Sequence, residues 1–179
     1  MIQTKKRLIV DMSATLIHQG HIRLLQRARK AADERDAIVV VALTSDAELL
    51  KVKGYLPELN FAERKEILLS CRYVDEVAPT PWLLDEEVFR AMRGDYLFHG
   101  ADNNNPIPAE KLIIVPRTPG VSSSELRLRS AQIIQSQINE HKIMLTPGPG
   151  SIPLENAFAV QPLFGRGDDD FTELEERVF

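Results

Sequence analysis

Residues 37–43 read Ala37-Ile-Val-Val-Val-Ala-Leu43 and are apolar at every position. A continuous run of this kind, rich in β-branched residues, is typical of a central strand in a parallel sheet whose two faces are both covered by helices. Short apolar runs and amphipathic segments alternate on either side of it. Strands that alternate with helices predict an α/β fold built on a doubly wound parallel sheet.

The other elements follow from the same periodicities. Four further strands, which make five in all, are expected at residues 8–10, 74–78, 96–99 and 112–115. Helices are expected at residues 22–32, 61–71, 85–93 and 122–139. Ligands in such sheets bind beyond the carboxyl ends of the strands, where the strand order reverses. The loops that follow the strands are therefore where site residues are expected.

The composition narrows the classes of protein. The chain has 179 residues, 44% of them apolar and 27% charged, with a formal net charge of -4. An excess of acidic residues disfavours a nucleic-acid partner, and no apolar run approaches the length of a membrane span. The single cysteine, Cys71, argues against a secreted domain held by disulfides. We expect a cytoplasmic protein with neither a nucleic-acid nor a membrane partner.

The segment His18-Gln19-Gly20-His21 follows the first strand and opens the first helix. Glycine lets a ligand approach the backbone closely, and a helix N-terminus offers free amides and partial positive charge. Imidazole donors placed there can stabilise negative charge on a phosphoryl group. The alternatives are a metal-binding pair or two solvated histidines, although a zinc site would need more ligands close in sequence.

A second candidate anion site joins the last strand to the last helix. It reads Arg117-Thr-Pro-Gly-Val-Ser-Ser-Ser124 and combines one arginine, several hydroxyls and a helix N-terminus. An ordinary capped helix start is the alternative, because Ser122 and Glu125 also fit a capping box. Together the two segments predict a site for one long polyanion, such as a nucleoside triphosphate. The chain has no Walker P-loop.

Four blocks of sequence resemble the H-x-G-H cytidylyltransferases, in the same order and across about residues 6–135. They are residues 11–25, 60–77, 96–102 and 116–125. The resemblance implies a Rossmann-like nucleotidyltransferase fold, a homodimer, and transfer of CMP from CTP to an acceptor anion with release of pyrophosphate. It implies Mg²⁺ bound mainly by the nucleotide itself, and the sequence singles out no metal ligand.

The resemblance also assigns roles to individual residues. Those with implied catalytic roles are His18, His21, Lys53 (with Lys51 as a rival) and Arg117. Those implied to bind the nucleotide are Ser13, Ala14, Gly20, Asp102, Thr118, Val121, Ser122 and Ser123. Those implied to bind the acceptor are Arg64, Arg72 and Trp82. Each has a plain structural alternative: a surface ion pair for an arginine, a turn for the aspartate, a buried aromatic for the tryptophan. His99 is expected to be structural.

Two features concern the acceptor. Met12-Ser13-Ala14 resembles the phosphonate cytidylyltransferases, a branch found joined to phosphoenolpyruvate mutase, although Thr15 stands where an Asp is usual. Residues 142–149 and 165–179 resemble the opening of 2-aminoethylphosphonate–pyruvate transaminases. We therefore expect a cytidylyltransferase domain at residues 1–139 and a linker or arm at 140–179. Pyridoxal phosphate would belong to a transaminase domain that these residues do not contain.

The expected reaction is CMP transfer to a phosphonate, with 2-aminoethylphosphonate as the first choice of acceptor and 2-hydroxyethylphosphonate as the second. Alternatives with the same fold are a glycerol-3-phosphate or ethanolamine-phosphate cytidylyltransferase, or an adenylyltransferase. An alternative of another class is an inactive docking module for a fused transaminase. Asp85, Glu86 and Glu87 are candidates for reading the far end of the acceptor only because they follow Trp82.

Overall fold

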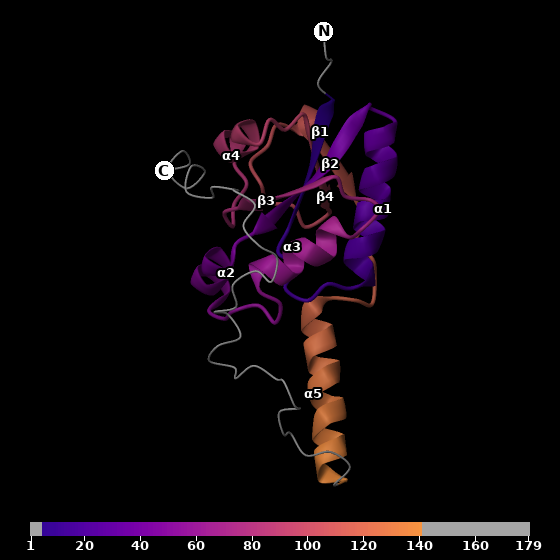
Figure 1. Ribbon diagram of the computed structural model, residues 1–179, viewed down its shortest axis with the longest axis vertical. Helices are drawn as coiled ribbons and strands as arrows, with labels where there is room; N and C mark the ends of the chain where they lie inside the picture. The colour runs from indigo at the N-terminus through magenta and orange to yellow at the C-terminus, as the bar shows by residue number, and fades with distance from the viewer. Residues whose placement is uncertain (1–4, 141–179) are drawn as a thin grey trace, which may run out of the picture. The chain divides into compact units, whose positions relative to one another are not determined.

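The computed structural model describes residues 5–140 and contains one sheet of five parallel strands. The strands are β1 (Lys6–Met12), β2 (Ala37–Thr44), β3 (Glu76–Thr80), β4 (Tyr96–Gly100) and β5 (Leu112–Val115). Their order across the sheet is β3-β2-β1-β4-β5, so the order reverses between β1 and β4 (Figure 1). The predicted doubly wound sheet and its five strands are confirmed, and the strand at residues 37–43 lies inside the sheet.

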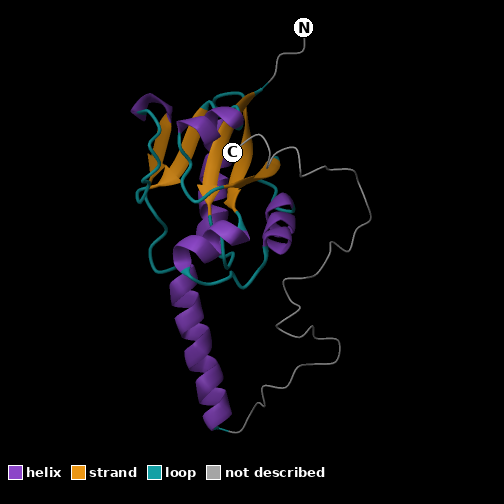
Figure 2. Ribbon diagram, turned by 90° about the vertical axis from the view of Figure 1, so that its left-hand side faces the viewer, coloured by secondary structure: helices purple, strands orange, loops and turns teal. Residues whose placement is uncertain are grey.

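The helices are α1 (Gln19–Asp33), α2 (Asp46–Lys53), α3 (Phe61–Leu69), α4 (Glu86–Ala91) and α5 (Ser123–Asn139), with a short 3-10 turn at Ala109–Lys111. Figure 2 distinguishes the helices, in purple, from the strands, in orange. The sequence pattern does not predict α2. This helix is only eight residues long and has little amphipathic character, so periodicity gives no signal. Its caps are local: the Ser45 side chain accepts from the Glu48 backbone, and Gly54 ends it in the left-handed conformation.

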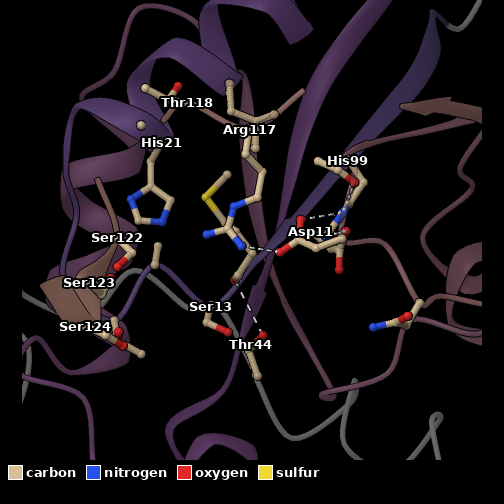
Figure 3. Close-up of a pocket in the computed structure, with 18 of the residues that line it drawn as sticks. Asp11, Ser13, His21, Thr44, His99, Arg117, Thr118, Ser122, Ser123 and Ser124 are labelled. Atoms are coloured by element: carbon tan, nitrogen blue, oxygen red, sulfur yellow. Dashed lines mark hydrogen bonds and ion pairs between the residues drawn. The ribbon is translucent and has the colours of Figure 1, made fainter. Parts of the chain in front are cut away.

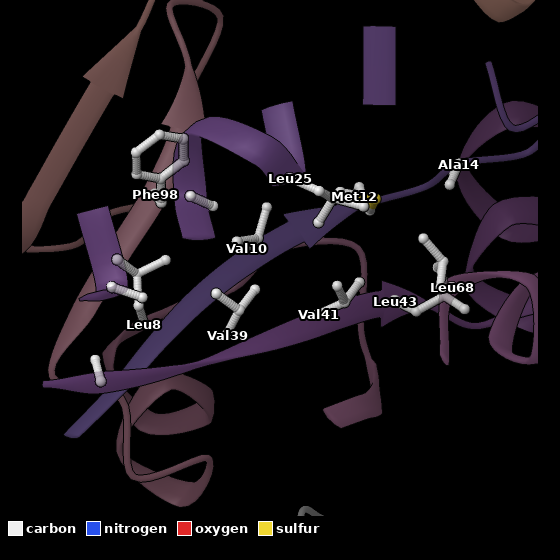
Figure 4. Packing of buried hydrophobic residues seen from close by; sticks show 13 residues of the cluster. Leu8, Val10, Met12, Ala14, Leu25, Val39, Val41, Leu43, Leu68 and Phe98 are labelled. Carbon is white, nitrogen blue, oxygen red and sulfur yellow. The ribbon is translucent and has the colours of Figure 1, made fainter. Parts of the chain in front are cut away.

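Alternate residues of the central strands face two separate apolar layers. On one face Leu8, Val10 and Val39 pack with Leu25 of α1 and Leu68 of α3 (Figure 4). On the other face the buried cluster joins Ile9, Val40 and Leu97 to Phe89 of α4. Both faces of β1 and β2 are thus covered, which explains why residues 37–43 are apolar without interruption.

The sheet opens where its strand order reverses. β1 pairs with β2 over seven residue positions, from Lys6 to Met12. With β4, β1 pairs over only two positions, at Leu8 and Ile9. Beyond these two positions the carboxyl ends of β1 and β4 are no longer paired, and a crevice lies between them. Such a crevice is the usual position of a ligand in a sheet of this type.

Among the described residues, the chain divides into two units between Ala131 and Gln132. The predicted arm lies outside the described residues from position 141 onward, so the division into a domain at 1–139 and an arm at 140–179 stays a prediction. Within residues 5–140, no helix is long and apolar enough to cross a membrane.

Candidate functional site

A cavity of about 530 Å³ lies at the carboxyl ends of the strands and collects most of the predicted site residues (Figure 3). The predicted residues that line it are Ser13, Ala14, Gly20, His21, Lys53, Trp82, Asp102, Arg117, Thr118, Ser122 and Ser123. We call Gly20, His21, Asp102, Arg117, Thr118 and Ser122–Ser124 the histidine group, and Thr15, Lys53, Tyr55, Trp82 and Arg127 the lysine group. His18 and Val121 line a smaller adjacent cavity of about 310 Å³.

The two histidines of the motif cap α1 reciprocally. His18 is the N-cap residue, and its Nδ1 accepts from the backbone N–H of Gly20 at 3.1 Å. The backbone N–H of His18 in turn donates to Nδ1 of His21 at 3.2 Å. Because each Nδ1 accepts a hydrogen bond, each neutral ring must carry its proton on Nε2. Both Nε2–H groups are thereby left to donate to a ligand.

The surroundings keep both rings neutral. Burial, then His18 and Arg117, lowers the pKa of His21 to about 3. Burial and Arg117 also lower the pKa of His18. A protonated His21 would lose the bond that its Nδ1 accepts from the His18 backbone. The pair is therefore built to offer neutral donors to an anion, rather than two imidazolium charges.

Gly20 is required by the packing of the motif itself. A Cβ at position 20 would lie 2.9 Å from Cε1 and 3.0 Å from Nδ1 of His18, and 3.2 Å from the Val121 side chain. Such contacts are too short for any L side chain to be tolerated without displacing the ring. Glycine thus allows His18 to fold back over the first turn of α1.

The second predicted anion segment completes the histidine group. Arg117 pairs with Asp102 at 2.7 Å, and the Ser122 hydroxyl accepts from the Glu125 backbone at 3.1 Å, which caps α5 as predicted. The Ser123 hydroxyl donates to the carbonyl of Leu16 at 3.2 Å and ties α5 to the loop before His18. The two segments, about 100 residues apart in the chain, thus line one cavity.

Of the two candidate lysines, Lys51 and Lys53, Lys53 faces the cavity. Nζ of Lys53 lies 5.2 Å from the centre of the Trp82 ring, and burial, Arg127 and Arg64 lower the pKa of Lys53. Lys51 is 75% exposed and pairs with Glu48, whose other oxygen accepts from the Trp82 backbone. Lys53 is therefore the lysine available to an anion, while Lys51 helps to neutralise the residue that holds Trp82.

Arg127, which no sequence motif marks, holds the lysine group together. Its guanidinium forms a two-pronged ion pair with Glu58, lies 5.0 Å above the Tyr55 ring and donates to the Thr15 hydroxyl at 2.8 Å. These contacts join α5 to the loop after Lys53 and to the loop after β1. The partners of Arg127 lie 69 to 112 positions away in the chain, so no local pattern marks this residue.

A third set, which we call the carboxylate cluster, consists of Asp11, His99 and Asn105 at the crevice between β1 and β4. Asn105 donates to Oδ2 of Asp11 at 2.9 Å. Oδ1 of Asp11 lies 3.3 Å from Nε2 of His99, yet no donor among the described residues is aligned to bond it. His99 was expected to be structural, but it also lines the cavity.

The model of the cytidylyltransferase-like family matches residues 13–129. This chain belongs to that family. Glycerol-3-phosphate cytidylyltransferase of Staphylococcus aureus is 32% identical over 127 residues, which are 68% of this chain and 92% of the relative.

Other relatives of the cytidylyltransferase-like chain are longer enzymes. Ethanolamine-phosphate cytidylyltransferase of Dictyostelium discoideum is 34% identical over 67% of this chain and 35% of its own length. Choline-phosphate cytidylyltransferase of Saccharomyces cerevisiae is also 34% identical, over 67% of this chain and 30% of its own. The chain spans about a third of the length of these two relatives.

Solved structures agree on the fold of the cytidylyltransferase-like unit. A lipopolysaccharide core biosynthesis protein from Thermoplasma volcanium superposes with a TM-score of 0.52 at 16% identity, covering 64% of this chain and 99% of that one. A macrolide-efflux protein from Streptococcus pneumoniae gives 0.55 at 25% identity, covering 70% and 52%. These likenesses support the α/β sheet and say nothing of the substrate.

Two of the predicted acceptor residues, Arg64 and Arg72, do not line the cavity. Arg64 is 0% exposed. Its guanidinium donates to the carbonyls of Ser13 at 2.6 Å, Thr44 at 2.9 Å and Leu59 at 3.1 Å, and pairs with Asp46 at 2.6 Å. Four of its five N–H groups are thus committed to the protein, which leaves a scaffold role.

Arg72, the other of these two residues, is exposed and lies over the Tyr73 ring at 5.9 Å. Its position is that of a surface cation.

The loop fastened by Arg64 is itself unusual, because Ala14 is 2% exposed and has a φ of 43°. That angle lies in the left-handed region, which costs free energy for a residue other than glycine. The bond from Arg64 to the neighbouring Ser13 carbonyl holds this conformation.

Residues 5–140 contain no group of three or more His, Cys, Asp or Glu side chains placed to hold an ion. The carboxylates at the cavity are instead bonded to Arg117 and Asn105. The described part of the chain therefore forms no cation cage of its own.

Proposed function

We propose that this chain transfers CMP from CTP to a phosphonate, with 2-aminoethylphosphonate as the preferred acceptor. The observation that carries the proposal is the joining of two unlike anion sites in one cavity. His21, Arg117 and Ser122 offer donors and charge for a polyphosphate, and Lys53 offers a separate cation beside Trp82. A nucleotidyl transfer needs this arrangement, because two anions must meet at one phosphorus atom.

The reaction follows from these groups. An acceptor phosphonate oxygen attacks the α-phosphorus of CTP in line, the new O–P bond forms, and the bond to the β-phosphate oxygen breaks to release pyrophosphate. The attacking oxygen is ionised at neutral pH, so no general base is required. CTP is the substrate as its magnesium complex, in which the phosphates hold the ion.

The protein's part is to position the two anions and to stabilise the charge that develops. Nε2–H of His21 and Nε2–H of His18 donate to phosphate oxygens, and their fixed Nδ1 acceptors keep that tautomer in place. Arg117 neutralises charge and is itself oriented by Asp102. Donors that are already oriented cost no reorganisation during the reaction, which is the main source of rate in phosphoryl chemistry.

The choice of a phosphonate rests on two features of the sequence: the Met12-Ser13-Ala14 start of the first loop, and the transaminase-like residues 142–149 and 165–179. A transaminase of that type makes or consumes 2-aminoethylphosphonate, so both activities would concern one compound. Thr15 is compatible with turnover, since its hydroxyl accepts from Arg127 and remains part of the lysine group.

A phosphate monoester is the second candidate acceptor. It is favoured by the relatives named for ethanolamine phosphate, choline phosphate and glycerol 3-phosphate, which are 32–34% identical to this chain. Phosphonates and phosphate esters present the same three oxygens to Lys53, and they differ in the bridging atom.

Pyrophosphate release with CTP tests the proposal. The expected order of kcat/KM is 2-aminoethylphosphonate, then 2-hydroxyethylphosphonate, then phosphoethanolamine and glycerol 3-phosphate. A preference for either ester would overturn the phosphonate assignment and keep the cytidylyltransferase. ATP in place of CTP tests the adenylyltransferase alternative. Binding of CTP without turnover of any acceptor would establish a docking module.

A further inference from the structure

We propose that Glu48 is a positioning residue that holds the Trp82 ring over Lys53 and thereby sets the affinity for the acceptor. The inference rests on the proposed function, because that proposal makes Lys53 the cation that receives the acceptor phosphonate. Glu48 lies outside the four sequence blocks of the family resemblance and does not line the cavity. It can therefore act on the acceptor only through the residues that it holds.

The loop that carries Trp82 has few attachments. It connects β3 to α4. The backbone N–H of Trp82 donates to Oε2 of Glu48 at 3.1 Å, and that of Leu84 donates to Oδ1 of Asn105 at 3.0 Å. Within the described part of the chain, residues 81–83 form no other hydrogen bond. Glu48 is thus what ties the first half of this loop to the rest of the fold.

Burial does not fix the Trp82 end of the loop. The Leu84 side chain is 0% exposed and belongs to the apolar layer around Phe89. Trp82, by contrast, is 38% exposed and belongs to neither buried cluster. The hydrogen bond to Glu48 is therefore the contact that orients the backbone from which the ring extends.

Glu48 is placed and charged for this contact. It lies in the first turn of α2, where its own backbone N–H donates to the Ser45 hydroxyl at 3.3 Å. The hydrogen bond from the Trp82 backbone, together with Lys51 at 3.3 Å, lowers the pKa of Glu48. Glu48 thus stays ionised at neutral pH, and an ionised acceptor makes a shorter and stronger hydrogen bond than a neutral one.

One short helix sets the distance between the ring and the ammonium group. Lys53 is the last residue of α2, and Trp82 is tethered to the first turn of the same helix. Nζ of Lys53 lies 5.2 Å from the ring centre, within the range of a cation–π contact. A lysine restricted by the ring loses less conformational entropy when an anion binds. Loss of the tether should therefore weaken acceptor binding and leave the histidine group unchanged.

Two conservative variants separate reach from charge. Glu48→Gln keeps an oxygen that can accept from the Trp82 backbone but has no charge. Glu48→Asp keeps the charge on a side chain that is one methylene shorter. If Glu48 acts through the hydrogen bond, Glu48→Gln retains the function and Glu48→Asp loses it. If Glu48 acts only by neutralising Lys51 or by favouring the N-terminus of α2, the order is the reverse.

The matched control is Glu86→Ala. Glu86 is also an acidic residue in the first turn of a short helix, and it pairs with Arg90 at 3.9 Å. It does not line the cavity, and neither do Asp85 and Glu87, the other acidic residues that follow Trp82. Glu86→Ala therefore measures the cost of removing such a residue without a change at the ring.

Fluorescence gives the first test, and it is independent of turnover. Trp82 is the only tryptophan of the chain, so its emission reports this ring. Glu48→Ala and Glu48→Asp should shift the emission to longer wavelength and increase quenching by acrylamide, because a released ring is more exposed to water. Glu48→Gln and Glu86→Ala should resemble the parent protein. Unchanged emission and quenching in Glu48→Ala would overturn the proposal.

Steady-state kinetics with CTP and 2-aminoethylphosphonate give the second test. Glu48→Ala should raise the KM for the acceptor about 10-fold, which is less than the 10²-fold that a misplacement of about 1 Å can cost. The KM for CTP should stay unchanged. Glu48→Asp should share this loss, while Glu48→Gln and Glu86→Ala should keep most of the parent affinity. A larger loss in Glu48→Gln than in Glu48→Asp would contradict the assignment.

The two hypotheses fail separately. If the parent protein prefers phosphate esters, the proposed function is wrong, and the same variants are then ranked with the preferred ester. If the parent protein uses phosphonates and Glu48→Ala leaves the KM for the acceptor unchanged, the proposed function stands and the role of Glu48 is wrong. Should Glu48→Ala fail to fold, the order of Glu48→Gln and Glu48→Asp decides.

Discussion

The histidine group and the lysine group line the same cavity but are assembled in opposite ways. His18, Gly20 and His21 hold one another over two or three residues of chain, and Ser122 is bonded to Glu125. In the lysine group, Arg127 reaches Thr15 across 112 positions and Glu58 across 69. One group is thus fixed by local backbone geometry and the other by the tertiary fold.

This difference has a functional consequence. Locally fixed donors are already oriented before a ligand arrives, which suits the part of the reaction that all nucleotidyl transfers share. A group assembled from distant segments can change when any of those segments changes. The lysine group is therefore the part of the cavity in which acceptor specificity is expected to vary.

The largest effect is expected from the histidine group. His21→Ala should lower kcat about 10²–10³-fold, the usual cost of losing one preoriented donor to developing charge. The fold should persist, because His21 lies in the capping turn and not among the buried apolar residues. Steady-state kinetics with CTP and circular dichroism measure the two properties. Activity close to that of the parent protein would remove His21 from the mechanism.

A smaller and more selective effect is expected from the lysine group. Lys53→Met should lower kcat/KM for the acceptor about 10–100-fold, the range for a hydrogen bond to a charged group, and leave the KM for CTP nearly unchanged. Lys51→Met is the matched control, since Lys51 is exposed and pairs with Glu48. Equal losses in the two variants would contradict the separation of the two lysines.

The neutral state of His21 predicts a pH dependence of stability. The folded protein holds its pKa near 3, while an unfolded histidine titrates near 6.5. The unfolded state therefore binds the proton first, and stability is lost as pH falls from 6.5 toward 3. Between pH 7.5 and pH 5 this loss should be roughly 2 kcal/mol.

Urea unfolding of the parent protein and of His21→Gln at the two pH values isolates this contribution, because the other titrating groups are common to both proteins. The parent should lose more stability than the variant on acidification. Parallel losses would mean that His21 is protonated in the folded state near neutral pH.

The smallest effect is expected from the fastening of the lysine group. A double-mutant cycle with Arg127→Met and Glu58→Gln should give a coupling of about 0.5–1 kcal/mol in unfolding free energy, as for a partly exposed but two-pronged pair. The exposed pair Arg90 and Glu86, 3.9 Å apart, is the control and should couple near zero. No coupling between Arg127 and Glu58 would show that the loop after Lys53 is held by other contacts.

The sequence was sufficient for most of the fold. Uninterrupted apolar runs are produced by strands buried on both faces, so β2 and its neighbours were predictable from periodicity. α2 was not, because eight residues with little amphipathic character leave only the caps at Ser45 and Gly54 as a signal.

Prediction placed His21 and Ser122 at the cavity, where each is bonded to backbone within three residues, while their functional roles stay predictions. It failed where a role depends on distant partners. Asp11 and Asn105 are 94 positions apart, so their contact could not be read from spacing.

The buried guanidinium of Arg64 has a consequence for any mutational scan scored on activity alone. Its removal would release the Ser13 carbonyl and leave Ala14 free to relax from its strained angle, which would displace the loop that lines the cavity. Such a variant would register as inactive and be mistaken for the loss of a substrate ligand. Measuring the yield of folded protein and the CTP affinity beside turnover would show that the loop is displaced. A displaced loop lowers activity equally with every acceptor, unlike the loss of a residue that binds one acceptor.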